Sequence, residues 1–169
     1  MPKKLRLDIG YDNDYILIGI ASHLRDYRLI WAMNLKMQLD LKKMEDLKIF
    51  QDKKNEFNTF SLFFYEEPHK YKTYYLISNS GEKGLLFPEH KQTNYFLLIK
   101  GNITSEKKIE LVKNIYTIVN ILTVHTISLS TIKNIDNFFS DLELFMLEMS
   151  KKKKEDEKRP FLKPPIQTV

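Results

Sequence analysis

The sequence predicts an α+β domain, in which an antiparallel or mixed sheet carries helices packed on one face. Runs of Ile, Val, Tyr and Phe, which favour strands, are bracketed by segments with helical periodicity. The 169 residues suit one domain, and an apolar content of 43% is enough for a core without disulfides or metals. A ferredoxin-like two-layer fold is one option within this class. We assign the domain to residues 1–150 and a flexible, disordered Lys/Pro-rich basic tail to residues 151–169.

The first part of the chain predicts strands around one helix. Residues 4–9 alternate polar and apolar side chains, which is the period of a half-buried strand. Residues 15–21 are apolar on every side, and their isoleucines and short length favour a strand over a helix. Residues 25–38 repeat apolar side chains at helical spacing, and a polar residue at the start can cap this helix. A short strand is expected near residues 47–50.

The middle of the chain is rich in aromatic residues and predicts a hairpin. Residues 57–66 and 71–79 are two runs that favour strands, and residues 67–70 join them through a turn that contains proline. Further strands are expected over residues 85–87 and 95–100, on either side of a polar segment.

The last third predicts a helix, a strand and a second helix. The first helix covers about residues 106–119. Its apolar face comprises Ile109, Val112, Tyr116 and Val119. Residues 121–129 are rich in Ile, Val and Thr and predict a strand, and Ser130 can cap an amphipathic helix that continues to Met149. Residues 151–169 then combine charges and prolines, which cannot bury a core and predict a mobile segment.

The net charge of +5 lies almost entirely in the predicted tail. Residues 1–150 carry 20 basic and 19 acidic residues, whereas residues 151–169 carry seven basic and three acidic ones. Only four of the 27 basic residues are arginines, the residue type that reads guanine or phosphate through two hydrogen bonds. The balanced body and the scarcity of arginine argue against base-specific recognition of nucleic acid.

No motif points to catalysis, to a cofactor or to a metal. The chain has no Cys, and its four His residues lack metal-ligand spacing. It contains neither a Gly-rich phosphate loop nor a nucleophile elbow. The first residues lack the apolar region of a signal peptide, and the longest purely apolar run is far short of the ~20 residues that span a bilayer. We therefore expect a cytoplasmic location and no membrane partner, and nothing positive supports an enzyme.

Residues 87–95, Phe-Pro-Glu-His-Lys-Gln-Thr-Asn-Tyr, resemble the signature of the bacterial IPExxxVDY family. The matching positions are Pro88, Glu89 and Tyr95. The first, seventh and eighth positions of the motif depart from it. Further similar stretches, including residues 17–20, 26–34 and 75–79, extend the resemblance over roughly residues 4–135.

The resemblance implies a protein of Bacteroidetes-type bacteria. It carries over no catalytic or binding residue, because the activity of that family is not established. If the Asp of the motif were a general base, the neutral amide of Asn94 could not replace it, because an amide takes up no proton. We interpret this position as structural.

The aromatic hairpin is the candidate interaction surface. Alternate side chains of a strand point to opposite faces, so both faces of this hairpin carry aromatic rings. Helices on one face would leave the other open, and an exposed aromatic patch usually marks a partner surface. The candidate residues are Phe63, Tyr65, Tyr71, Tyr74 and Tyr75. The sequence thus predicts a non-enzymatic interaction domain that binds a protein partner or a second copy of itself.

Two alternatives stay open for the same hairpin. Its rings could stack single-stranded bases while Lys70, Lys72 and the basic tail contact phosphates, as in a nucleic-acid accessory protein. Alternatively, a helix or a second subunit could bury the open face, and we favour this over base stacking.

Glu89 and Asn34 each have a structural and a functional interpretation. Glu89 and Lys91 could line the mouth of a pocket, or Glu89 could hold its own loop, which we favour. Asn34 lies on the apolar face of the first helix, where a buried amide must find partners. We interpret it as an anchor for a neighbouring strand or loop rather than as a ligand contact.

Overall fold

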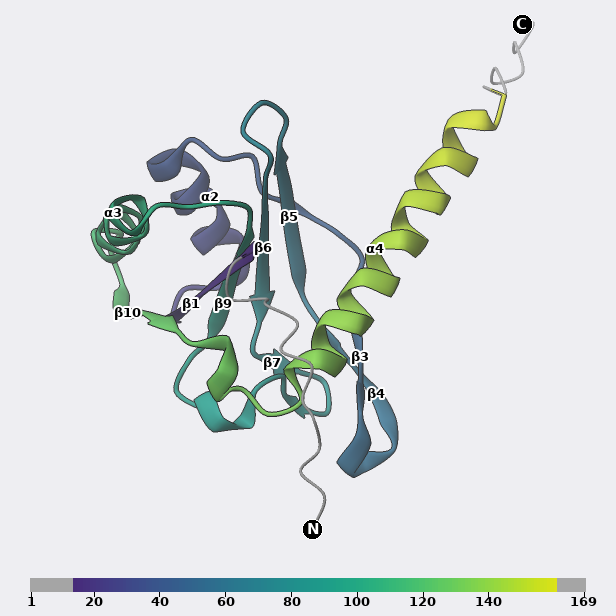
Figure 1. Ribbon diagram of the computed structural model, residues 1–169, viewed down its shortest axis with the longest axis horizontal. Helices are drawn as coiled ribbons and strands as arrows, with labels where there is room; N and C mark the ends of the chain where they lie inside the picture. Colours follow the sequence, from purple (N-terminus) through teal and green to yellow (C-terminus); the bar gives the residue numbers. More distant parts are fainter. Residues whose placement is uncertain (1–13, 161–169) are drawn as a thin grey trace, which may run out of the picture.

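The structure of the protein, a computed structural model, describes residues 14–160. Its centre is a six-stranded sheet in which every neighbouring pair is antiparallel, with the strand order β10-β1-β9-β6-β5-β2 (Figure 1). The strands are β1 (Tyr15–Ser22), β2 (Lys42–Lys43), β5 (Leu62–Glu67), β6 (Lys72–Ser78), β9 (Tyr95–Lys100) and β10 (Ile121–Ile127). The α+β class and the antiparallel sheet that the sequence predicts are confirmed. The strand predicted at residues 4–9 lies outside the described residues.

The middle of this sheet is covered on both faces. Strand β9 pairs with β1 on one side and with β6 on the other, and its residues 95–99 are all buried. Strands with two covered faces consist of continuous apolar runs rather than of alternating residues. This explains why residues 15–21 and 95–99 show no alternation.

Helices α2 (Asp26–Met37) and α3 (Ser105–Tyr116) cover one face of the sheet (Figure 1). Helix α2 buries Leu29, Ile30 and Met33 against it, whereas α3 buries Ile115. The apolar face predicted for residues 106–119 is wrong for Ile109, Tyr116 and Val119, which are exposed, and only Val112 of that face is partly buried. Helix α3 packs through Ile115, with Leu111 and Val112 partly buried beside it, and is thus rotated relative to the prediction.

Helix α4 (Ile135–Lys158) and a second, two-stranded sheet cover the opposite face. The second sheet pairs β3 (Leu47–Gln51) with β4 (Glu56–Phe60). Their core includes Phe60, Phe96, Phe138 and Phe139, which are all buried. The sequence places helices on one face only, and the structure corrects this, because α4 occupies the other face and makes three layers.

The basic segment after residue 150 is helical over most of its described length. Helix α4 continues to Lys158, so the predicted boundary at residue 150 falls inside a helix and the predicted disorder is wrong for residues 151–158. Lys and Glu are good helix formers, so this stretch needs no core to continue the helix. One ion pair, from Lys152 Nζ to a carboxylate oxygen of Glu45 at 2.9 Å, also ties it to the body. Every residue from 150 to 160 is exposed.

The predicted aromatic hairpin exists, but its first strand is shorter than predicted. The hairpin joins β5 to β6, with Phe63 opposite Leu76 and Tyr65 opposite Tyr74. Residues 56–60 belong to β4 in the second sheet, and the chain changes sheets at Ser61. The remaining short elements are β7 (Ser80–Gly81), β8 (Gly84–Leu85), η1 (Asp52–Lys54), η2 (Pro88–His90) and η3 (Leu129–Thr131).

Candidate binding site

The predicted aromatic surface does not exist as one exposed patch. Phe63 and Tyr74 are buried under α2 and α3, and Tyr75 is buried on the opposite face, in the core beneath α4. The premise that one face of the hairpin stays open is therefore wrong. A helix of the same chain covers it, which is one of the alternatives left open by the sequence.

The other two predicted residues do not restore that surface. Tyr65 is half-buried and stacks on Tyr74, with ring centroids 6.0 Å apart and planes inclined by 24°. Burial first, and Glu67 second, raise the pKa of Tyr74 to about 12. Only Tyr71 is open to solvent, with 91% of its surface exposed, and it occupies the left-handed region (φ 52°) at the end of the hairpin turn. One isolated ring in a turn is not a patch.

The loop of residues 87–94, which contains most of the family-like motif, is held from inside by Asn79. Its side-chain amide donates to the carbonyl oxygens of His90 and Thr93 at 3.0 and 2.8 Å, and its oxygen accepts from Phe87 N at 2.9 Å. Asn79 is 1% exposed. The sequence offers only the adjacent turn as a signal for this residue, because its partners lie 8 to 14 positions further along the chain.

The motif positions have separate roles. Tyr95 donates from its hydroxyl to the carbonyl oxygen of Leu24 at 2.8 Å, and its ring belongs to the core beneath α2. Asn94 Oδ1 accepts from Ser22 N at 2.8 Å, which supports the structural interpretation of that position. Glu89 Oε1 accepts from Lys133 N at 3.0 Å, so Glu89 holds the chain ahead of α4 rather than its own loop.

Asn34, in α2, is the predicted anchor, because both polar atoms of its side-chain amide form hydrogen bonds with the backbone of Leu41.

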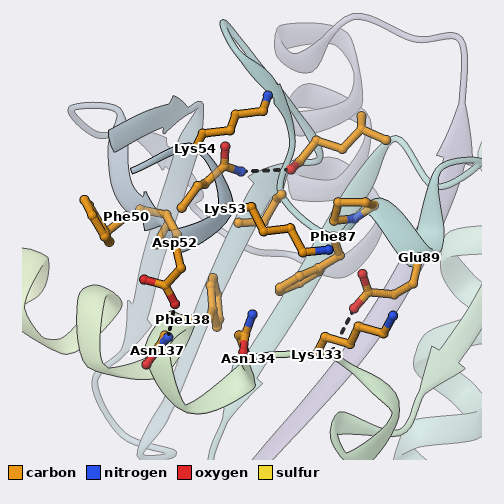
Figure 2. Close-up of a pocket in the computed structure, with 15 residues that line it drawn as sticks. Phe50, Asp52, Lys53, Lys54, Phe87, Glu89, Lys133, Asn134, Asn137 and Phe138 are labelled. Carbon is orange, nitrogen blue, oxygen red and sulfur yellow. Dashed lines mark hydrogen bonds between the residues drawn. The ribbon is translucent and has the colours of Figure 1, made fainter. Parts of the chain in front are cut away.

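Pro88 and Glu89 also line a cavity of about 410 Å³. Three segments that lie far apart in the sequence enclose it, residues 49–54, 85–89 and 133–138 (Figure 2). Glu89 therefore lines a pocket, which is the alternative that the sequence analysis did not favour, in addition to making its structural bond. Lys91 does not line this cavity.

A second candidate lies on the outer face of α2, which we call the α2 ridge: Tyr27, Trp31 and Leu35. The three residues follow at intervals of four, so they share one face of the helix, and each is more than half exposed. Trp31, the only Trp of the chain, is 69% exposed. Helical spacing groups Trp31 and Leu35 with Ile30, but the residues of α2 that the sheet buries are Leu29, Ile30 and Met33.

Three exposed cations belong to α2 or to its N-cap. Arg25, Arg28 and Lys36 are exposed and form no ion pair with any residue of the described range 14–160. The only acid of α2 is Asp26, which is half-buried and accepts a hydrogen bond from Tyr27 N. Arg28 lies three residues before Trp31, so the two side chains are neighbours on the surface of the helix.

His90 and His125 lie close together beside the loop, with ring centroids 6.5 Å apart. Partial desolvation first, and His90 second, lower the pKa of His125 below its usual value. At acidic pH the folded protein therefore binds fewer protons at His125 than the unfolded chain does. The free energy of unfolding has its full value above about pH 6.5 and decreases as the pH drops through that value.

We expect the free energy of unfolding to decrease between about pH 7.5 and about pH 5.5, and to decrease less in His125→Gln. Urea denaturation at both pH values measures this, with His69→Gln in the exposed hairpin turn as the matched control. An equal decrease in wild type and His125→Gln would contradict the assignment.

No protein-family model, no curated protein and no solved structure was found to match this chain. The resemblance to the IPExxxVDY family stays a prediction. Within residues 14–160, no three His, Asp or Glu side chains are grouped so that they could hold a metal ion. No helix in that range is long and apolar enough to cross a membrane.

Proposed function

We propose that this protein is a non-enzymatic interaction domain that binds an acidic, amphipathic helix of a protein partner through the α2 ridge. The observation that carries the proposal is the exposed Tyr27-Trp31-Leu35 row on a helix that, with its N-cap, also carries three exposed, unpaired cations. Trp, Tyr and Arg are the residue types that contribute most to binding energy in protein interfaces. Amphipathic helices bind such surfaces through apolar side chains spaced three or four residues apart.

The charges favour an acidic partner over a second copy of the chain. A second copy would bring Arg25, Arg28 and Lys36 against the same three cations, and this face offers one half-buried Asp to neutralise them. Carboxylates that flank an apolar helix face would pair with all three cations. Electrostatic complementarity of this kind raises the association rate and excludes partners of the wrong charge.

Single-stranded nucleic acid is the second candidate, since aromatic rings beside cations also stack bases. Two features of the structure disfavour it. The ridge ends in the aliphatic Leu35, and the basic end of α4 lies on the other side of the sheet, so the two cannot form one continuous track (Figure 1). A phosphate backbone is bound best by a groove that concentrates positive charge.

The test is a selection of helical peptides of about 18 residues from a displayed library, followed by fluorescence anisotropy with labelled peptides. We expect selected peptides to combine apolar residues at helical spacing with flanking Asp and Glu. Trp31→Ala and Arg28→Glu are each expected to weaken binding at least about tenfold. Leu144→Ala, an exposed leucine on α4, is the matched control and should leave affinity unchanged.

Any one of three results would overturn the proposal. The first is that selected peptides bind Trp31→Ala as tightly as they bind the wild-type protein. A single-stranded oligonucleotide could bind with a steep salt dependence that Trp31→Ala abolishes. The wild-type protein could have the mass of a dimer in light scattering and revert to a monomer in Trp31→Ala, which would assign the ridge to self-association.

A further inference from the structure

We propose that the cavity between β3, the segment 85–89 and the start of α4 binds a small ligand with a flat apolar body and a single anionic group. Its volume of about 410 Å³ lies in the range of small-molecule sites, roughly 300–1,000 Å³. The site is separate from the α2 ridge, and the two proposals can fail independently.

The walls are apolar and are fixed before any ligand binds. Phe87 and Phe138 are buried in the core and pack edge to face, with ring centroids 5.2 Å apart and planes inclined by 68°. Phe50, in β3, also belongs to the lining, but its ring packs edge to face on Phe57, with centroids 5.2 Å apart, and lies away from Phe87 and Phe138 (Figure 2). Aromatic walls of this kind favour a planar ring, which binds by offset stacking or by edge contacts.

Two lysines provide the positive charge of the site. Figure 2 shows the side chain of Lys53 extending across the cavity toward Phe87 and Glu89, while Lys133 lies beside Glu89 on the far rim. Neither lysine forms an ion pair with another residue of the described range. Their ammonium groups are available to an anion.

The other charges of the lining are already engaged. Lys54 donates to the carbonyl oxygen of Lys83, and Asp52 accepts from the side chain of Asn137 at 3.1 Å. One oxygen of Glu89 is held by Lys133 N. The lining thus contains three lysines and two carboxylates, a small positive balance that suits one negative charge and disfavours a polyphosphate.

Two further features support an anion that carries a hydrogen-bond donor. The cavity reaches the first turn of α4, where the helix dipole favours negative charge and the N-cap residue Asn134 makes no side-chain cap bond. Gln51 Oε1 is buried in the lining and has no donor among residues 14–160, although its amide donates to the carbonyl oxygen of Leu85 at 3.2 Å. A ligand N–H or O–H would reach that oxygen only after the side chain of Gln51 rotates, because the oxygen is buried in this structure.

The probe for this site is anilinonaphthalene sulfonate, which has flat rings, one anionic group and an N–H. Its neutral analogue without the sulfonate, N-phenyl-naphthylamine, is the matched probe. We expect the sulfonate probe to bind at one site, and Lys53→Ala/Lys133→Ala to weaken it at least about tenfold, because two charge-assisted contacts are lost. Lys107→Ala/Lys113→Ala on α3 removes the same charge elsewhere and should leave affinity unchanged.

Amide chemical shifts locate the bound probe, and they are expected to change within residues 49–54, 85–89 and 133–138. Displacement by phenylacetate or by phenyl phosphate then shows whether the site prefers a carboxylate or a phosphate monoester. The proposal is overturned if the neutral analogue binds equally well, if the lysine pair has no effect, or if Trp31→Ala alone abolishes binding. The last result would place the probe on the α2 ridge.

Discussion

Replacing Phe139 by alanine is expected to lower the free energy of unfolding by about 3–5 kcal/mol, the range for deleting a buried Phe side chain. Phe139 is 0% exposed and packs on the ring of Tyr15 in β1, with centroids 4.6 Å apart. It also contacts the ring of Phe138 at 5.4 Å. This side chain joins α4 to the central sheet, so its loss leaves a cavity that α4 cannot close without moving.

Urea denaturation followed by circular dichroism measures this effect. Leu144→Ala, on the same helix but 57% exposed, is the matched control and should change stability by less than about 0.5 kcal/mol. A loss below about 1 kcal/mol in Phe139→Ala would mean that α4 does not pack on the sheet through this residue.

Replacing Asn79 by alanine is expected to lower the free energy of unfolding by about 4 kcal/mol. The substitution removes three side-chain hydrogen bonds and leaves Phe87 N and Thr93 O without that partner, whereas His90 O still accepts from Thr93 N. Each orphaned buried group costs about 1–3 kcal/mol. Asn79→Asp should be no better, because a carboxylate would face two carbonyl oxygens instead of donating to them.

Hydrogen exchange separates this effect from a general loss of stability. Amides of residues 86–94 should exchange faster in Asn79→Ala than amides of β1 and β9, because the loop loses its internal support first. Gln92→Ala in the same loop, where the side chain is exposed, is the control and should leave both measurements unchanged. Stability within about 1 kcal/mol of wild type would refute the role of Asn79.

Local sequence patterns were sufficient to predict those helices and strands whose pattern lies entirely within their own residues. Strand β1, helix α2 and strand β9 follow the sequence within one or two residues, since each is defined by its own periodicity or apolar run. The hairpin turn was predicted equally well. The division of residues 57–66 between two strands was not predicted. Residues before Ser61 pair with β3 and residues after it pair with β6, and only the tertiary fold determines this change of partner.

The surfaces were harder to predict than the elements. Periodicity shows that Trp31 and Leu35 fall at helical spacing with Ile30, but it does not show which of them the sheet can cover. The aromatic hairpin was misread for the related reason that α4, which begins 57 residues after the end of β6, covers one of its faces. The cavity beside Glu89 combines three distant segments, and no spacing within one of them could reveal it.

The two edges of the central sheet differ in how readily they would accept a foreign strand. The β2 edge consists of two exposed lysines, and a short, charged edge resists intermolecular pairing. The β10 edge has seven residues with no Asp, Glu, Lys or Arg, and no strand within residues 14–160 pairs with its outer side. Aggregation of partly unfolded molecules would therefore begin at β10, which makes that strand the place for a solubilising charge.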